Sequence, residues 1–193
     1  MTRNEAHNLM IQMLKSKNLQ KHGLAVEAIM RALCKYLQNV HDREQNEFDE
    51  EEWGIVGLLH DADYELVEKD PTRHTLVTEE KLRPLGASER IINGIKAHHD
   101  GIKASRDNYL EKAVYAADDM SGLITAVALV RPDKKLSSVT VDSVVKKFHQ
   151  KSFASGAKRE QILACERELD IPLEEFVGIA LKAMQGISDQ LGL

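Results

Sequence analysis

Apolar residues recur along this chain with the spacing of an α-helix. From residue 4 to residue 190 they repeat every three or four positions, which gives each segment one apolar face and one charged face. No alternating, β-branched run between turn residues interrupts the pattern. Cap and break signals divide it into separate helices. The pattern predicts helices over roughly residues 4–17, 22–39, 73–83, 89–99, 109–130, 140–151, 157–169 and 173–190.

Another helix begins most clearly at Asp49. The Asp49 side chain can cap the first turn, Glu52 can complete a capping box, and Phe48 can pack on Trp53. The acidic residues that follow Asp49 suit a helix N-terminus, because the helix dipole is positive there. We predict that this helix continues to Asp61.

The breaks between helices predict an all-α bundle with two parts. Proline interrupts the periodicity at Pro71 and Pro132, and no internal repeat or low-complexity linker is present. The best candidate for a subdivision is the stretch over residues 131–138. We therefore expect a helical core over residues 1–130, with C-terminal helices over residues 131–193 packed on the same domain.

Composition is that of a globular protein outside the membrane. Of 193 residues, 42% are apolar and 30% are charged. The N-terminal residues lack the apolar region of a secretory signal, and no apolar run reaches the roughly 18 to 20 residues that span a bilayer. Cys34 and Cys165 lack the paired spacing of a zinc or redox motif. We expect a cytoplasmic protein with both cysteines reduced and buried, and no membrane partner.

Charge is distributed unevenly along the chain. The net charge of -5 argues against a nucleic-acid polymer as a partner. Residues 131–159, however, hold eight Lys or Arg against two Asp and carry +6, which leaves -11 on the rest. Such a segment is either a solvated helical face or a basic rim that attracts a phosphorylated substrate.

The dipeptide His-Asp occurs more than once, so by itself it is a weak signal. It lies at residues 41–42, 60–61 and 99–100. The first occurrence opens a polar run and is interpreted as a solvated helix end. His60, in contrast, shares an apolar helical stripe with Trp53 and Val56. Asp61 follows at the C-terminal end of that helix, where the dipole and burial both disfavour a carboxylate without a compensating cation.

Other histidines and an aspartate also point toward an interior. His22 lies on the apolar stripe of its helix, and Asp118 lies within an apolar helix, where an unpaired carboxylate is costly. His98 and His99 end an isoleucine-rich helix and can face the same interior. Taken alone, a histidine on an apolar face is usually an ordinary core residue. Asp119 points about 100° away from Asp118 and is expected in solvent or behind the metal ligands.

In their order along the chain, these residues and His74 resemble the HD superfamily of metal-dependent phosphohydrolases. The matching segments are His22-Gly23-Leu24-Ala25-Val26, Leu58-Leu59-His60-Asp61-Ala62, Lys96-Ala97-His98-His99 and Ala117-Asp118-Asp119-Met120-Ser121. Together they span about half of the chain. Asp63 departs from the resemblance, because many relatives carry a small residue there. The chain also lacks the Gly-Tyr-Pro extension of the subgroup specific for cyclic dinucleotides.

The resemblance implies an HD-domain-like helical bundle around a buried metal site. In such proteins the first histidine, the His-Asp pair and the last aspartate bind one metal, and by position these are His22, His60, Asp61 and Asp118. Members with extra central histidines bind a second metal, bridged by the aspartate of the pair, and here those histidines are His74, His98 and His99. Two divalent ions are therefore expected, drawn from manganese, iron, zinc, nickel or magnesium.

The reaction that the resemblance implies is hydrolysis of a phosphate ester or anhydride of a nucleotide or small molecule by metal-bound hydroxide. Asp61 and His60 are expected at the catalytic centre, and Arg73, Lys103 and Arg106 are candidate phosphate contacts. A few relatives hold two irons with the same ligands and oxidise a substrate with oxygen, so a di-iron oxygenase is an alternative. A non-catalytic, metal-stabilised regulatory or binding module is another. The sequence predicts no particular substrate and no oligomeric state.

Overall fold

The computed structural model describes residues 1–41, 47–68 and 70–193. Within these residues the chain forms helices and no strand, so the all-α prediction is confirmed. The longer helices are α1 (Arg3–Met13), α2 (Lys17–His41), α3 (Glu50–Leu59), α5 (Glu89–Ala97), α6 (Tyr109–Leu129) and α10 (Leu173–Gln185). The shorter ones are α4 (Leu76–Leu82), α7 (Val141–Phe148), α8 (Arg159–Ile162), α9 (Ala164–Leu169) and α11 (Ser188–Leu191), with 3₁₀ helices η2 (Arg83–Leu85) and η3 (Leu136–Ser138).

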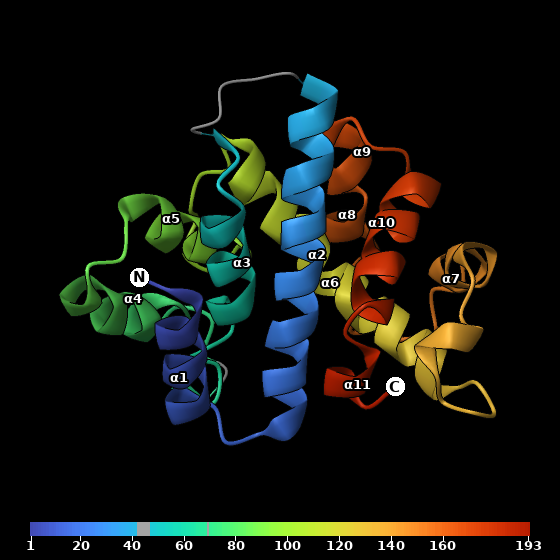
Figure 1. Cartoon of the computed structure of the whole chain (residues 1–193), viewed down its shortest axis with the longest axis horizontal. Helices are drawn as coiled ribbons and strands as arrows, with labels where there is room; N and C mark the ends of the chain where they lie inside the picture. Colours follow the sequence, from blue (N-terminus) through green and yellow to red (C-terminus); the bar gives the residue numbers. More distant parts are fainter. Residues whose placement is uncertain (42–46, 69) are drawn as a thin grey trace.

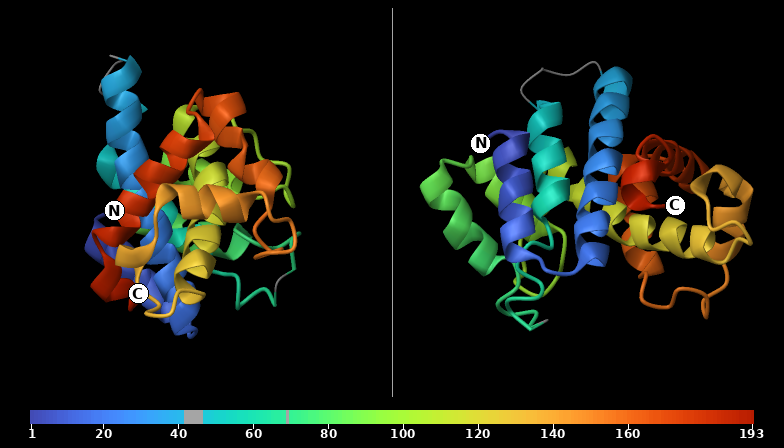
Figure 2. Two further views of the ribbon diagram at one scale, coloured as in Figure 1. Left: turned by 90° about the vertical axis from the view of Figure 1, so that its right-hand side faces the viewer. Right: turned by 60° about the horizontal axis from the view of Figure 1, so that its bottom comes forward.

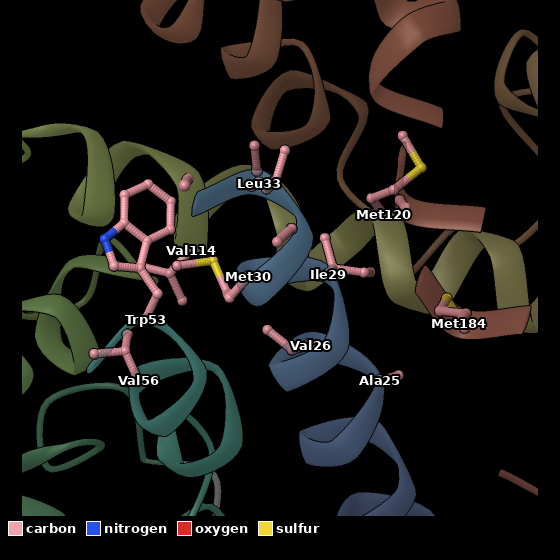
Figure 3. Packing of buried hydrophobic residues seen from close by; sticks show 14 of the residues in the cluster. Ala25, Val26, Ile29, Met30, Leu33, Trp53, Val56, Val114, Met120 and Met184 are labelled. Carbon is pink, nitrogen blue, oxygen red and sulfur yellow. The ribbon is translucent and has the colours of Figure 1, made fainter. Parts of the chain in front are cut away.

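The long helix α2 occupies the centre of the bundle. Figure 1 shows α2 between α3 on one side and α10 on the other, with α6 passing behind it. Its apolar residues face both neighbours, since Met30 lies toward Trp53 of α3 and Ile29 lies on the side of Met120 and Met184 (Figure 3). All five side chains are fully buried. Burial of each large apolar side chain contributes about 1.5–3 kcal/mol, so α2 is held from two sides.

The start of α3 follows the sequence prediction in two respects and departs from it in a third. Asp49 caps the helix by accepting hydrogen bonds from two backbone N–H groups of the first turn, at 2.9 and 3.2 Å. Phe48 stacks on Trp53 with ring centroids 5.9 Å apart. The predicted capping box is wrong, because the Glu52 carboxylate instead accepts a hydrogen bond of 2.6 Å from the hydroxyl of Ser88. Glu52 thereby ties α3 to the start of α5.

Several predicted helices have different boundaries in the structure. The helix predicted over residues 4–17 ends at Met13, the one predicted over residues 22–39 begins at Lys17, and the one predicted over residues 173–190 is divided into α10 and α11. The helix predicted over residues 73–83 starts at Leu76, because Thr75 has a φ of 74°, a left-handed conformation that an α-helix excludes. The segment predicted as one helix over residues 157–169 forms the two short helices α8 and α9. As a result, His74 lies in a turn and not on a helix.

The C-terminal helices pack on the same core as the N-terminal ones. α10 lies against α2 and α6, and α7 lies against α10 (Figure 1 and Figure 2). Phe176 and Met184 of α10 are fully buried in this core. The division of the chain near residue 130 stays a prediction.

Three further expectations concern membrane spans, the dipeptide at residues 41–42 and the cysteines. No helix among them is long and apolar enough to cross a membrane. Of the dipeptide at residues 41–42, the first residue ends α2 and the second lies outside the described residues, so its predicted solvation stays a prediction. Cys34 and Cys165 are free and buried, as predicted.

Candidate metal centre

A close approach of α2 and α3 brings the first two histidines together. A Cβ atom at Gly57 would lie 2.8 Å from the backbone of α2, and a Cβ atom at Gly23 would lie 2.8 Å from the backbone of α3. Only glycine at both positions lets the two backbones come so close. His22 directly precedes Gly23, and His60 follows Gly57 by about one turn. Their Nε2 atoms consequently lie 3.0 Å apart.

The first ligand group combines these histidines with Asp118 of α6. The Asp118 carboxylate lies 3.0 Å from Nε2 of His22 and 3.6 Å from Nε2 of His60. Nδ1–H of His60 donates a hydrogen bond of 2.8 Å to the carbonyl oxygen of Gly57, and Nδ1 of His22 lies 2.9 Å from the hydroxyl oxygen of Ser121. Both Nδ1 atoms are therefore engaged by the protein, and both Nε2 atoms face the shared centre.

The second ligand group consists of Asp61, His74 and His98. Oδ1 of Asp61 lies 3.1 Å from Nε2 of His74 and 3.5 Å from Nε2 of His98, and these two nitrogen atoms are 3.0 Å apart. His98 is oriented by donation from its Nδ1–H to the carbonyl oxygen of Ile95, at 2.6 Å. As in the first group, the Nε2 atoms of two histidines and a carboxylate oxygen converge. The Nδ1 atom of each histidine is held by another group of the protein.

The Asp61 carboxylate lies between the two groups. Its Oδ2 is 3.6 Å from Nε2 of His22 and 3.7 Å from Nε2 of His60, while its Oδ1 faces the second group. The possible ligand atoms within each group lie within 4.8 Å of one another. Two imidazoles and a carboxylate form a mixed donor set that fits manganese, iron, zinc or nickel. The residues present therefore fit two metal ions.

Charges in this centre compensate one another. Burial lowers the pKa of His60, but the carboxylates of Asp61 and Asp118 outweigh it and raise that pKa to about 9. The pKa of His74 is likewise lowered by burial and raised, to about 9 overall, by Asp61 and Asp63. Burial would raise the pKa values of Asp61 and Asp118, yet the surrounding imidazoles hold both well below the ordinary range. The carboxylates and the imidazoles of His60 and His74 thus favour each other's charged forms.

Asp63 supports the second group from behind. Its side chain is fully buried, and its Oδ1 accepts a hydrogen bond of 2.7 Å from Nδ1–H of His74. The same carboxylate accepts backbone N–H groups of Thr75 at 3.0 Å and Thr78 at 2.9 Å. The sequence comparison identified Asp63 only as a departure from the family pattern. The sequence signal that could have predicted this role is the position of the Asp63 carboxylate, two residues after Asp61 in an apolar context.

His99 lies beside the second group without joining it. Its ring centroid is 4.7 Å from that of His74, and its Nδ1 accepts a hydrogen bond of 3.0 Å from the backbone N–H of Gly101. Burial and the neighbouring imidazoles of His98 and His74 lower the pKa of His99 to about 4. Its predicted role as a metal ligand stays a prediction.

The ligands open onto a cavity of about 350 Å³. It is lined by Asp61, Tyr64, Pro71, His74, His98, His99, Asp118, Asp119, Gly156, Lys158 and Gln161. Asp119, expected in solvent or behind the ligands, thus lies on the cavity wall, and burial together with Asp118 raises its pKa to about 6. Gln161 of α8 joins the wall to the ligands, because its side-chain amide donates a hydrogen bond of 3.2 Å to the carbonyl oxygen of His98.

The predicted phosphate contacts do not line this cavity. Arg73 and Lys103 are exposed in turns outside it. Arg106 donates hydrogen bonds to the carbonyl oxygen of Ala97 and to Asp100, and its guanidinium lies 3.8 Å from the ring centroid of Tyr115. Among the described residues, the positively charged side chain that lines the cavity wall is that of Lys158. The sequence indicated this residue only through the basic segment over residues 131–159, which contains Lys158.

Comparison with known proteins identifies the family of the segment that contains both ligand groups. The family model of the HD domain matches residues 19–123, a little more than half of the chain. No curated protein and no solved structure matches the chain at a significant level. The matched segment contains both ligand groups, from His22 to Asp118. The wall residues Gly156, Lys158 and Gln161 lie beyond it.

Proposed function

Because the chain belongs to the HD-domain family, which consists largely of metal-dependent phosphohydrolases, we propose that it hydrolyses a phosphate ester or anhydride. The substrate is a phosphorylated small molecule or a nucleotide. The observation that carries this proposal is the position of Asp61, whose two carboxylate oxygens face different ligand groups. A carboxylate shared in this way suits a pair of divalent ions that act on one phosphoryl group.

Two sets of residues would hold the ions, and Asp61 would contribute one oxygen to each set. The other ligands are His22, His60 and Asp118 in the first set and His74 and His98 in the second. Ions bound there supply Lewis-acid activation of water and of a phosphoryl oxygen. The chain itself orients the ligands, since the carbonyl oxygens of Gly57 and Ile95 fix the rings of His60 and His98.

Lys158 would bind the phosphate on the cavity wall. Its ammonium is a strongly hydrated point charge that suits phosphate, and a charge-assisted hydrogen bond contributes about 1.5–3 kcal/mol. Lys158→Met should therefore raise KM by roughly tenfold to a hundredfold. Lys151→Met is the matched control, because Lys151 lies in the same loop, is exposed and lines none of the cavities described. Equal effects of the two substitutions would contradict the role of Lys158.

Metal analysis coupled to a screen of phosphate substrates tests the proposed function. Protein reconstituted with manganese, iron, zinc or nickel should hold about two ions per chain and hydrolyse at least one phosphomonoester or nucleotide. Asp61→Ala should abolish turnover, whereas the exposed Asp142→Ala should not change it. A wild-type chain that binds none of these metals would overturn the proposal, and so would turnover that survives Asp61→Ala.

A further inference from the structure

The cavity at the metal centre is the first of three cavities that are linked by shared lining residues, and we call the three together the groove. The first cavity shares Asp118, Asp119 and Gly156 with a second cavity of about 240 Å³. The second cavity shares His22 and Gly122 with a third, of about 360 Å³. A cavity needs only about 10–15 Å³ to hold one water, so the second cavity alone has room for several waters. A phosphate group at the ligands therefore leaves most of the groove free for the rest of a molecule.

Along α6 the groove runs from Asp118 toward Thr125, and His22 of the first ligand group lines its second and third cavities. Asp118 lies at its first end and Thr125 lines the third cavity, and these residues are seven apart on one helix. At 1.5 Å per residue the axial separation is about 10 Å. A substrate with its phosphate at Asp118 thus needs an organic group of about this length to reach Thr125 in the third cavity.

Gly122 forms an open part of the groove between the two ends. It lines both the second and the third cavity, and a Cβ atom added there would meet no heavy atom within 4 Å. Packing of the protein therefore does not require glycine at this position. A glycine within a helix costs about 1 kcal/mol relative to alanine, and here it leaves this part of the groove wall without a side chain.

The third cavity offers a cation at the far end. Its lining residues are Asn18, Lys21, His22, Gly122, Thr125, Leu129, Leu191, Gly192 and Leu193. Lys21 provides the positively charged side chain of this lining. In the part of the chain that the structure describes, no carboxylate lies within ion-pair distance of its ammonium. Asn18 and Thr125 add polar groups beside it. Because Leu129, Leu191 and Leu193 make the rest of the lining apolar, an organic group that ends in an anion beside Lys21 fits this cavity.

We propose that the substrate carries a second anionic group, a phosphate or a carboxylate, which Lys21 binds while the organic group lies over Gly122. This inference rests on the proposed function, because the first phosphate is placed at the metal ligands. It narrows the substrate class to phosphate esters that carry a second acidic group at the far end of the organic group.

A ladder of synthetic esters tests the second anionic group. Alkyl monophosphates, alkanediol bisphosphates and ω-carboxyalkyl phosphates of increasing chain length are compared in kcat/KM. The doubly anionic esters should exceed the monophosphates of equal length by about tenfold or more once the chain spans the groove, as expected for a charge-assisted contact. Comparison of the bisphosphate and carboxyalkyl series identifies which anion Lys21 prefers. A flat profile in both series would overturn the proposal.

Two substitutions tie that preference to the groove. Lys21→Met should remove the advantage of the doubly anionic esters, whereas Lys17→Met, one turn earlier on α2 and outside the cavity, should preserve it. Gly122→Phe should lower the ratio of kcat/KM for long over short esters by about tenfold, because the ring fills the open stretch. Gly122→Ala, which adds little bulk, should lower that ratio much less. An unchanged ratio in Gly122→Phe would contradict the proposed path.

Thiol labelling provides a readout that needs no turnover. Burial raises the pKa of the native thiols of Cys34 and Cys165 to about 12, so neither reacts readily in the folded protein. The thiol of a Thr125→Cys variant should be labelled quickly and protected by a long bisphosphate, but not by inorganic phosphate. Val40→Cys, on an exposed part of α2 far from the groove, should show no protection by either ligand.

The two readouts separate failure of the inference from failure of the proposed function. Protection at Thr125→Cys without hydrolysis of any ester would support the groove and contradict the hydrolase. Hydrolysis of short esters without protection, and without preference for a second anion, would support the hydrolase and overturn the inference.

Discussion

At the scale of single residues, two aspartates of the same loop perform different tasks. Asp61 faces the ligand groups with both oxygens, whereas Asp63 points away from the cavity and is fully buried. Asp63 fixes the ring of His74 through Nδ1–H and also holds the turn that carries His74, through the backbone N–H groups of Thr75 and Thr78. A carboxylate behind a ligating histidine sets its tautomer and raises its basicity. Asp63 is thus a positioning residue for the second group alone.

Asp63→Asn tests this role with a side chain of equal size. The amide can still accept from the backbone but no longer provides the charge that faces His74. We expect the affinity for the second metal ion to fall by about 10- to 100-fold while the first ion binds as before. Equilibrium dialysis with elemental analysis measures both sites. Asp142→Asn, an exposed residue at the start of α7, is the control, and equal weakening of both ions in Asp63→Asn would contradict the assignment.

At the scale of helices, the metal centre depends on how closely α2 and α3 approach. Gly23 and Gly57 each present a backbone without a side chain to the other helix. Their neighbours His22 and His60 are brought to within 3.0 Å as a direct consequence. Backbone atoms cannot move aside as a flexible side chain can, so this contact tolerates no added methyl group.

Gly57→Ala should therefore destabilise the protein and separate the first ligand pair. The added Cβ would lie 2.8 Å from the backbone of α2, and overpacking of this kind costs about 1–3 kcal/mol. Gly178→Ala in α10 is the control, because its Cβ would make an ordinary contact of 3.8 Å with Val141 and should stabilise the helix by up to about 1 kcal/mol. Urea unfolding measures both changes. Equal stability of the two variants would contradict the close-packing argument.

The loop before α8 is the second element on which the site depends. Residues 149–158 carry Gly156 and Lys158 to the cavity, and Arg159 folds this loop around its guanidinium. The guanidinium donates hydrogen bonds to the carbonyl oxygens of Phe148, Phe153, Ala154 and Ala157, at 2.5 to 3.1 Å. One planar cation thus organises a segment that has no regular structure of its own.

Arg159→Lys should loosen this loop although the charge is kept. A lysine ammonium cannot reproduce the planar fork, so several carbonyl oxygens lose their donor. Hydrogen exchange of the amides at residues 149–158 should accelerate, and KM should rise because Lys158 is no longer held at the cavity, while metal content stays constant. Arg167→Lys is the matched control, since Arg167 on α9 is exposed and pairs with Glu160. Equal exchange in the two variants would contradict the role of Arg159.

At the scale of the whole molecule, the sequence predicted which histidines and aspartates lie together better than it predicted their surroundings. Histidines and aspartates on apolar helical faces were recognisable because burial of such groups demands a partner, as at His60 and Asp118. The turn around His74 was predicted as a helix, since the left-handed Thr75 depends on Asp63, a contact that helical periodicity does not contain. Lys158 was missed as a single residue because it reaches the cavity wall only through the folding of the C-terminal segment.

The ligands come from elements spread over much of the chain. His22 lies on α2, Asp118 on α6, and the remaining ligands at the ends of α3 and α5 or in the turn before α4. The unfolded chain has no such site, so any metal that binds the assembled groups stabilises the fold through linkage.

Addition of metal should therefore raise the melting temperature of the metal-free protein. An ion at 100 times its Kd contributes about 2.7 kcal/mol, and a chain of this size gains roughly 2–4 °C per kcal/mol, so we expect a rise of roughly 5–10 °C. The rise should grow with the logarithm of the free metal concentration, because the folded state alone binds the ion. In His60→Ala the first group loses a ligand, and the rise at the same metal concentration should shrink. Calorimetry across a metal titration measures both chains, and an identical rise in the variant would place the stabilising ions outside the proposed centre.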